Sequence, residues 1–123
     1  MKINKNNPFA EVSGIEAKRK MLRALSKSVK NTAKMMGIGV NEALVMSYKD
    51  KNHQKFHTFM DWKEKGFMVK RGAKAFCVWS SPLKKEVENK KGEKEEQETG
   101  FFGIAHIFSN YQVKRIEKWI YLN

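Results

Sequence analysis

Apolar positions in the first third of the chain recur at the spacing of an α-helix. The apolar side chains that would share one helical face are Ile15, Leu22, Leu25, Val29, Ala33 and Met36. Ser13 followed by Glu16 has the pattern of a capping box, and Gly37 supplies a left-handed stop. The pattern therefore predicts one long helix over residues 14–36.

Two shorter helices are expected in the middle of the chain. A helix with Asn41 as its N-cap would carry the apolar run 43–45 and Tyr48. Thr58, with an aspartate three residues later, has the pattern of a second capping box and predicts a short helix over residues 59–65.

Strand-forming residues dominate the second half of the chain. A short strand is expected at 56–58, and longer ones at 73–80 and 100–109, where aromatic and β-branched side chains gather. The stretch 84–98 between the two longer strands is almost entirely charged and has little to bury. We interpret it as a solvated, mobile loop over 84–99 or as the tip of a long hairpin, so the flanking strands should pair antiparallel.

Helices followed by strands predict an α+β domain, with N-terminal helices packed on a small, mainly antiparallel sheet. One domain should span residues 1–123, because this length suits a single core. The last segment is ambiguous: Val113, Ile116 and Ile120 suit a helix, whereas residues 119–122 suit a strand equally well.

The composition narrows the class of protein. A hydrophobic fraction of 41% supplies enough apolar material for a core. No apolar run is long enough to cross a membrane, and the N-terminus lacks the apolar region of a secretory signal. The single cysteine, Cys77, excludes an internal disulfide framework and a cysteine-based zinc site. We therefore expect a reduced, cytoplasmic protein.

The charge points to a polyanionic partner. Lys and Arg number 25 against 13 Asp and Glu, giving a formal net charge of +12. Residues 1–82 carry 17 basic and 6 acidic side chains, so the excess lies in the first two-thirds. This sign excludes an acidic mimic of DNA and is typical of proteins that meet nucleic acid or anionic membranes. We expect nucleic acid and no membrane partner.

A stripe of cations follows the predicted long helix on the side away from its apolar face. Its members are Lys20, Arg23, Lys27, Lys30 and Lys34. No Asp or Glu occurs from residue 17 to residue 41, although a helix face that serves solubility alone usually mixes both signs. The stripe is either a solvated face or a ladder for nucleic-acid phosphates.

Cations and aromatic rings are interleaved between residues 48 and 79, a pattern typical of single-strand binding, in which cations hold phosphates and rings stack on bases. Many rings in such a segment belong to the core, and we expect this for Phe56, Phe59, Phe76 and Phe102. For Tyr48, Trp62 and Trp79 a core role and a stacking role are about equally supported.

The run from Lys70 to Lys74 (KRGAK) predicts a basic turn. Gly72 permits a positive φ, and three cations surround it. Backbone amides in such a turn can form an anion-binding nest, which predicts a phosphate site; a plain exposed turn is the equal alternative.

Residues able to carry catalysis form no arrangement that indicates an enzyme. His53 and His57 are four apart, but their segment lacks a helical pattern, and no H-E-x-x-H motif is present. Cys77 lies within a predicted strand, where it has the character of a small buried hydrophobe. We therefore expect no enzymatic activity, no metal and no cofactor.

Four segments between residues 39 and 113 carry a specific combination of motifs. They are 39–47 (GVNEALVMS), 56–59 (FHTF), 66–78 (GFMVKRGAKAFCV) and 106–113 (HIFSNYQV). Together they resemble the N-terminal single-stranded-DNA-binding domain of ArdC-type anti-restriction proteins. The third segment is the most specific and is similar to the family pattern Gly-x-x-Val-x-Lys-Gly-x-Lys-x-x-x-Val. Phe56 stands where the family usually has tryptophan, and the charged tract falls where it tolerates an insertion.

The resemblance implies a module that binds single-stranded DNA with little sequence preference, in a mobile-element setting such as a conjugative plasmid or transposon. ArdC-type proteins also carry a metalloprotease-like domain. Because this chain has no H-E-x-x-H motif, the resemblance implies a binding module and not a protease. The alternative is a protein-interaction subunit that docks a conjugation, replication or restriction protein, its basic surface being secondary.

The basic turn should contribute more to DNA binding than the helix stripe does. The stripe has no aromatic residue on its own face, and the long helix lies largely outside the resembling segments. The turn lies between Trp62 and Trp79 in sequence. The expected DNA-binding residues are Tyr48, Lys49, Lys55, Trp62, Lys63, Lys70, Arg71, Lys74 and Trp79.

Overall fold

A computed structural model describes residues 7–116, apart from the side chains of residues 82–85 and 96–101. Its elements in chain order are α1 (Ile15–Met36), α2 (Val40–Tyr48), β1 (Phe56–Thr58), α3 (Phe59–Glu64), β2 (Phe67–Val69), β3 (Phe76–Glu88), β4 (Lys94–Ser109), the 3-10 helix η1 (Asn110–Gln112) and β5 (Val113–Arg115). The expected α+β class is confirmed. None of the helices within residues 7–116 has the length and apolarity that crossing a bilayer requires.

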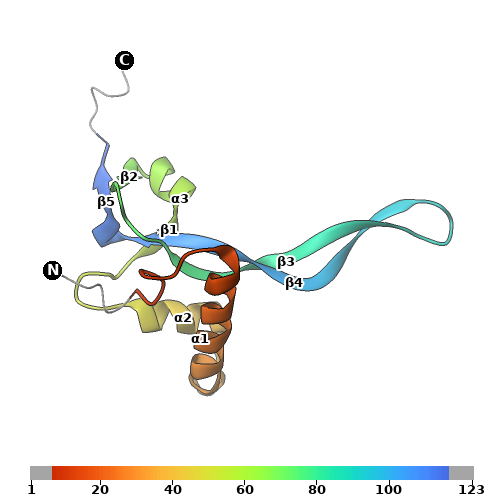
Figure 1. The fold of residues 1–123 in the computed structure, drawn as a ribbon, viewed down its shortest axis with the longest axis horizontal. Helices are drawn as coiled ribbons and strands as arrows, with labels where there is room; N and C mark the ends of the chain where they lie inside the picture. Colours follow the sequence, from red (N-terminus) through yellow and green to blue (C-terminus); the bar gives the residue numbers. More distant parts are fainter. Residues whose placement is uncertain (1–6, 117–123) are drawn as a thin grey trace, which may run out of the picture.

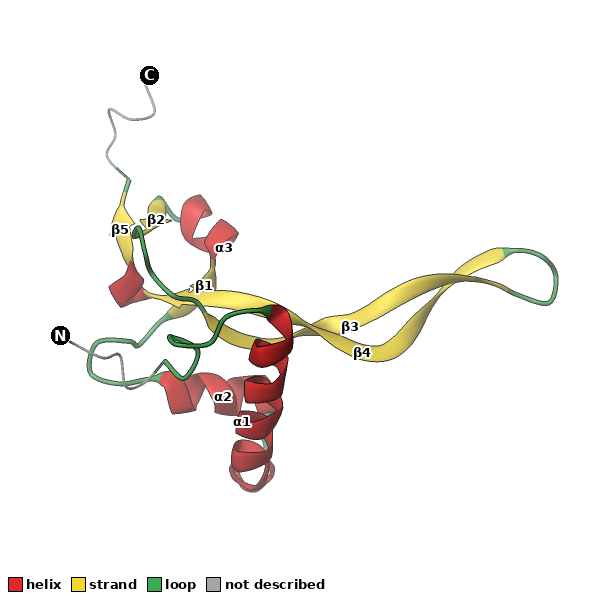
Figure 2. Cartoon of the chain, in the orientation of Figure 1, coloured by secondary structure: helices red, strands yellow, loops and turns green. Residues whose placement is uncertain are grey.

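Two small antiparallel sheets organise the chain. One has the strand order β1-β4-β3, and the other pairs β2 with β5. In Figure 1, α1 and α2 lie on one side of the larger sheet, and α3 with the β2–β5 pair lies on the other. Figure 2 shows that the distal half of the β3–β4 hairpin extends far beyond the other elements. In the order β1-β4-β3, strand β3 lies at an edge of the larger sheet, and α1 and α2 partly cover it.

The core forms where α1 and α2 meet the base of the hairpin. Its buried members are Phe9, Leu22, Leu44, Tyr48, Phe76, Cys77, Val78 and Ile107. Burying each large apolar side chain stabilises the fold by roughly 1.5–3 kcal/mol. The hydroxyl of Tyr48 donates to the carbonyl of Cys77 (2.8 Å), and burial raises the pKa of both side chains, so both stay protonated at neutral pH.

The prediction for α1 is confirmed except at its start. Gly37 ends the helix in the left-handed region (φ 68°), and its N–H bonds to the carbonyls of the last turn. At the other end the N-cap is Gly14, with no side-chain cap, so the expected Ser13 capping box is wrong. Helix α2 begins two residues earlier than expected, with Gly39 and not Asn41 as N-cap. This places Asn41 inside the first turn and leaves its amide available for another contact.

The junction between β1 and α3 follows the expected pattern. The hydroxyl of Thr58 accepts from the backbone N–H of Asp61 (3.2 Å), which caps α3. The helix ends at Glu64, close to the predicted boundary, and Gly66 follows with a φ of 90°. Strand β1 pairs with the end of β4, so this short unit is attached directly to the larger sheet.

The charged tract is a hairpin and not a loop, which corrects the first of the two interpretations. Residues 84–88 pair with residues 94–98, and only 89–93 form the turn. The side chain of Asn89 accepts from the backbone N–H groups of Lys91 and Glu93. Backbone hydrogen bonds between the strands hold this segment without burial, a source of order that a hydrophobic pattern does not reveal.

The chain after β4 differs from the expected helix. Ser109 and Gln112 form a capping box around η1, and residues 113–115 then pair with β2 as strand β5. The pairing leaves no helical turn at Val113, so that alternative is wrong for this part. The alternatives placed on Ile120 and on residues 119–122 lie outside the described residues.

Candidate nucleic-acid interface

The basic turn forms as predicted. Gly72 has a φ of 81°, and the N–H of Ala73 bonds to the carbonyl of Lys70 (3.1 Å). The ammonium of Lys70 donates to the carbonyl of Tyr111 (3.1 Å) and lies 5.4 Å from the centre of its ring. Lys70 therefore holds the turn against η1, which leaves Arg71 and Lys74 as exposed cations.

Two of the three candidate stacking rings are buried. Tyr48 is 1% exposed and packs among the rings of the core. Trp62 is 5% exposed, and its indole N–H donates to the carbonyl of Phe108 (2.7 Å). Both rings are almost wholly buried, so the structure favours a core role for each. Of the three, only Trp79 is partly open to solvent.

Two of the four rings expected in the core are instead on the surface. Phe76 is buried and Phe56 half-buried, as expected for core residues. Phe59 at the start of α3 is 51% exposed, and Phe102 on β4 is 45% exposed. Ile104 and Ala105, further along β4, pack against the core, whereas Phe102 does not and instead lines the groove described next.

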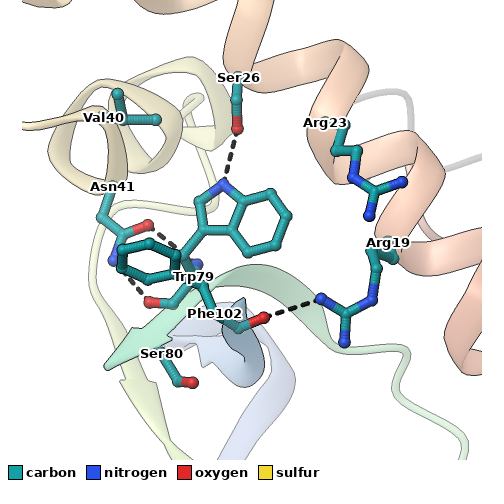
Figure 3. A pocket seen from close by; sticks show the side chains of 8 residues that line it. All are labelled: Arg19, Arg23, Ser26, Val40, Asn41, Trp79, Ser80 and Phe102. Carbon is teal, nitrogen blue, oxygen red and sulfur yellow. Dashed lines mark hydrogen bonds between the residues drawn. The ribbon is translucent and has the colours of Figure 1, made fainter. Parts of the chain in front are cut away.

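A groove of about 640 Å³ opens between α1 and the base of the β3–β4 hairpin (Figure 3). Helix α1 supplies Arg19, Arg23 and Ser26, α2 supplies Val40 and Asn41, β3 supplies Trp79 and Ser80, and β4 supplies Phe102. The lining combines two arginines with two aromatic rings, and none of the described residues that line it is acidic. Its volume lies within the range of about 300–1,000 Å³ that is usual for small-ligand sites.

Trp79 is fixed in this groove by three hydrogen bonds. The side-chain amide of Asn41 accepts from the N–H of Trp79 (2.9 Å) and donates to its carbonyl (2.7 Å). Because β3 is an edge strand, no further strand pairs with it on this side, and the amide of Asn41 satisfies the backbone N–H and carbonyl of Trp79 instead. The indole N–H donates to the hydroxyl of Ser26 (2.8 Å), as Figure 3 shows. The ring is thus held before any ligand arrives.

The two arginines have different surroundings. Arg19 donates to the carbonyl of Phe102 (2.8 Å), which ties α1 to β4. One turn further along α1, the exposed Arg23 has no hydrogen-bond or ion-pair partner among the side chains that the structure describes. Lys18 adds a second tie to β4 through His106 (3.4 Å), whose pKa is lowered by burial and by this lysine. The ring of His106 is therefore neutral and accepts from the ammonium.

The remaining predicted cations do not line the groove beside α1. Lys55 lines a second groove, of about 460 Å³, together with His57, Trp62, Lys65, Phe67, Asn110 and Val113. Lys49 and Lys63 are exposed and line neither groove. Of the nine predicted DNA-binding residues, Trp79 alone lies in the groove beside α1.

The two closely spaced histidines do not share a site. His53 is buried and hydrogen-bonds to the hydroxyl of Ser109 through Nδ1. His57 packs edge-on against Trp62 instead, with the ring centres 4.8 Å apart. Within residues 7–116 the described side chains form no cluster of three or more histidine, cysteine or acidic residues that could hold a metal ion.

A family model for the N-terminal domain of anti-restriction factor ArdC matches residues 18–110. The chain belongs to this family. No curated protein and no solved structure matches it. The ArdC N-terminal match begins inside α1 and runs to the end of β4, so it includes every residue of the groove. The expectation that the long helix lies largely outside the family region is therefore wrong.

Arg19 and Phe102 are the groove residues that the sequence interpretation missed. Arg19 falls outside the stripe, although its spacing of four from Arg23 places the two guanidinium groups on one side of α1. Phe102 lies 83 residues from Arg19 in the chain, so only the course of the hairpin brings them together.

Proposed function

We propose that this ArdC N-terminal chain is a binding module for single-stranded DNA with little sequence preference, and not an enzyme. The observation that carries the proposal is the groove beside α1, where unpartnered positive charge and aromatic rings occupy one surface. Single strands are held by that combination, whereas a purely electrostatic surface holds duplex equally well.

The α1 surface next to the groove supports the same ligand. All five cations of the predicted stripe are exposed, and Arg23 belongs both to the stripe and to the groove. No carboxylate between residues 17 and 41 opposes them. Phosphates of a strand along this part of α1 would therefore meet cations of the same helix and no carboxylate from it.

The biological setting is proposed from the family. The matching model is that of the N-terminal domain of an anti-restriction factor. We infer that the chain acts in the cytoplasm, on behalf of a mobile element, and that a conjugation or restriction protein is its further partner. The charged hairpin, which carries both signs and projects from the body, is the surface that favours a protein partner.

A salt titration of the whole chain against single- and double-stranded oligonucleotides of equal length tests the proposal. Tighter binding of the single strand is expected, with affinity falling by roughly 0.7 log units per log unit of salt for each phosphate held. Equal or tighter binding of the duplex at every salt concentration would show that stacking of bases on the rings does not contribute to binding. Absence of DNA binding, with salt-tolerant binding of a restriction or conjugation protein, would favour the interaction subunit.

A further inference from the structure

We propose that the groove between α1 and the base of the β3–β4 hairpin holds one unpaired nucleobase together with its phosphate. The inference rests on the proposed function and assigns its base-recognition site. In this arrangement the base stacks on Phe102 beside Trp79, and Arg23 holds the phosphate.

The two rings form a corner that leaves room for a third. The centres of Trp79 and Phe102 lie 6.4 Å apart, and their planes meet at 68°. Rings at this angle touch edge to face, so Phe102 keeps a face that Trp79 does not cover. That face is available because Phe102 is nearly half exposed.

The groove is built before the ligand binds. Three hydrogen bonds fix Trp79, and Ser26 in turn donates to the carbonyl of Leu22 within α1 (2.7 Å). Arg19 holds the backbone of Phe102 through its carbonyl, so the position of β4 relative to α1 does not depend on the phenyl ring. A preformed site loses little conformational entropy when it binds, which favours affinity.

Positive charge lies beside the indole of Trp79, on the side away from the phenyl ring of Phe102. Figure 3 shows both guanidinium groups along the α1 wall, facing the side of the groove where the indole of Trp79 lies. Arg23 retains all five of its N–H donors, and a guanidinium matches the two oxygens of a phosphate group. A nucleotide has this arrangement of a flat apolar base next to a phosphate.

This site requires an unpaired base. In a duplex both faces of each base are already stacked and its edge is paired, so a paired base must first be extruded at a cost in free energy. Single-stranded DNA offers its bases without that cost. The groove therefore provides the preference for single strands, and the exposed cations of α1 provide the general attraction to phosphate.

The test compares a short oligothymidylate with an abasic strand of equal length, which keeps every phosphate and lacks every base. The wild-type chain should bind the base-bearing strand roughly tenfold more tightly, the scale of one stacked base. Phe102→Ala should remove this preference and leave abasic-strand binding unchanged. The matched control is Phe59→Ala, which removes an equally exposed ring on α3, outside the groove.

A second variant separates the base from the phosphate. Arg23→Ala should weaken the binding of both strands by the same factor and keep the preference between them. Circular dichroism and the thermal midpoint verify that each variant is folded. A preference that survives Phe102→Ala, or that Phe59→Ala removes instead, would overturn the base site. If the wild-type chain binds neither strand at low salt, the proposed function itself fails, a result distinct from the loss of preference alone.

Discussion

The basic turn at residues 70–74 and the groove beside α1 both combine cations with an aromatic ring, and they differ in how they are assembled. The turn is visible in the sequence as adjacent cations around a glycine, whereas the groove is assembled from α1, α2, β3 and β4. The exposed ring next to the turn is Tyr111, and the ammonium of Lys70 already lies over one of its faces. The groove has fewer cations, but its ring Phe102 keeps an open face.

The comparison shows that nearness in sequence is a poor guide to which cations share a surface with rings. Trp62 and Trp79 flank the turn along the chain, yet one is buried and the other lies against α1. The stripe has no ring on its own helix, but the hairpin brings Trp79 and Phe102 into the groove that Arg23 lines. These two reasons for ranking the turn above the helix no longer hold, and the family match over residues 18–110 removes the third. We now expect the groove to contribute more to DNA binding than the turn.

The largest effect should come from removing a ring and a cation of the groove together. Phe102→Ala combined with Arg23→Ala should cost about 2–4 kcal/mol of single-strand binding at low salt, taking ~1–3 kcal/mol for a stacked base and ~1 kcal/mol for the charged contact. Fluorescence anisotropy with a labelled single strand measures the change. Phe59→Ala with Lys114→Ala is the control, since both residues are exposed and distant from the groove in sequence and fold.

A smaller effect is expected at the basic turn. Arg71→Ala with Lys74→Ala should weaken binding by about 1–2 kcal/mol at low salt and lower the salt slope by about 1.4, as two phosphate contacts are lost. Lys70 is left in place because it holds Tyr111. The thermal midpoint should not change, since both side chains are exposed. A larger loss here than in the groove variant would restore the ranking that the sequence suggested.

Asn41→Ala tests whether the groove depends on its fixed tryptophan. The substitution leaves the N–H and carbonyl of Trp79 without their amide partner at a partly solvated edge, so it should lower the free energy of unfolding by about 1 kcal/mol. Urea titration gives this value, with the exposed Asn31→Ala as control. Single-strand binding should fall as well. Unchanged stability and binding would show that the ring needs no such support.

The smallest effect should come from the projecting hairpin. Replacing residues 84–98 by a short turn should leave the thermal midpoint within a few degrees, because the described side chains of this tract are largely exposed and loop length has a weak entropic cost. Single-strand binding should also persist, since the groove lies at the base of the hairpin. Collapse of the soluble yield would mean that the distal strands are needed for folding.

Several elements of this fold follow from local sequence rules. Three features depend only on residues within one helical turn and are therefore predictable from the sequence: the 3.6-residue period of α1, the left-handed Gly37 and the Thr58 cap. The distal hairpin was only one of two alternatives, because paired backbone groups leave no apolar pattern.

The site was less predictable because it depends on long-range packing. The sequence shows that Tyr48, Trp62 and Phe102 are aromatic, but it does not show which of them are buried in the core. Tyr48 and Trp62 each donate to a backbone carbonyl of the hairpin, whereas Phe102 is not among the residues packed against the core. Which rings remain free is therefore decided by the path of β3 and β4, and the sequence alone does not specify that path.

The central claim is that the groove, and not the turn, gives the chain its preference for single strands. The most direct test measures the ratio of single-strand to duplex affinity at one salt concentration for the wild-type chain, for Phe102→Ala and for Arg71→Ala with Lys74→Ala. We predict that Phe102→Ala brings the ratio close to one, whereas the turn variant weakens both ligands alike and keeps the ratio. A ratio that Phe102→Ala leaves intact and the turn variant abolishes would contradict the account.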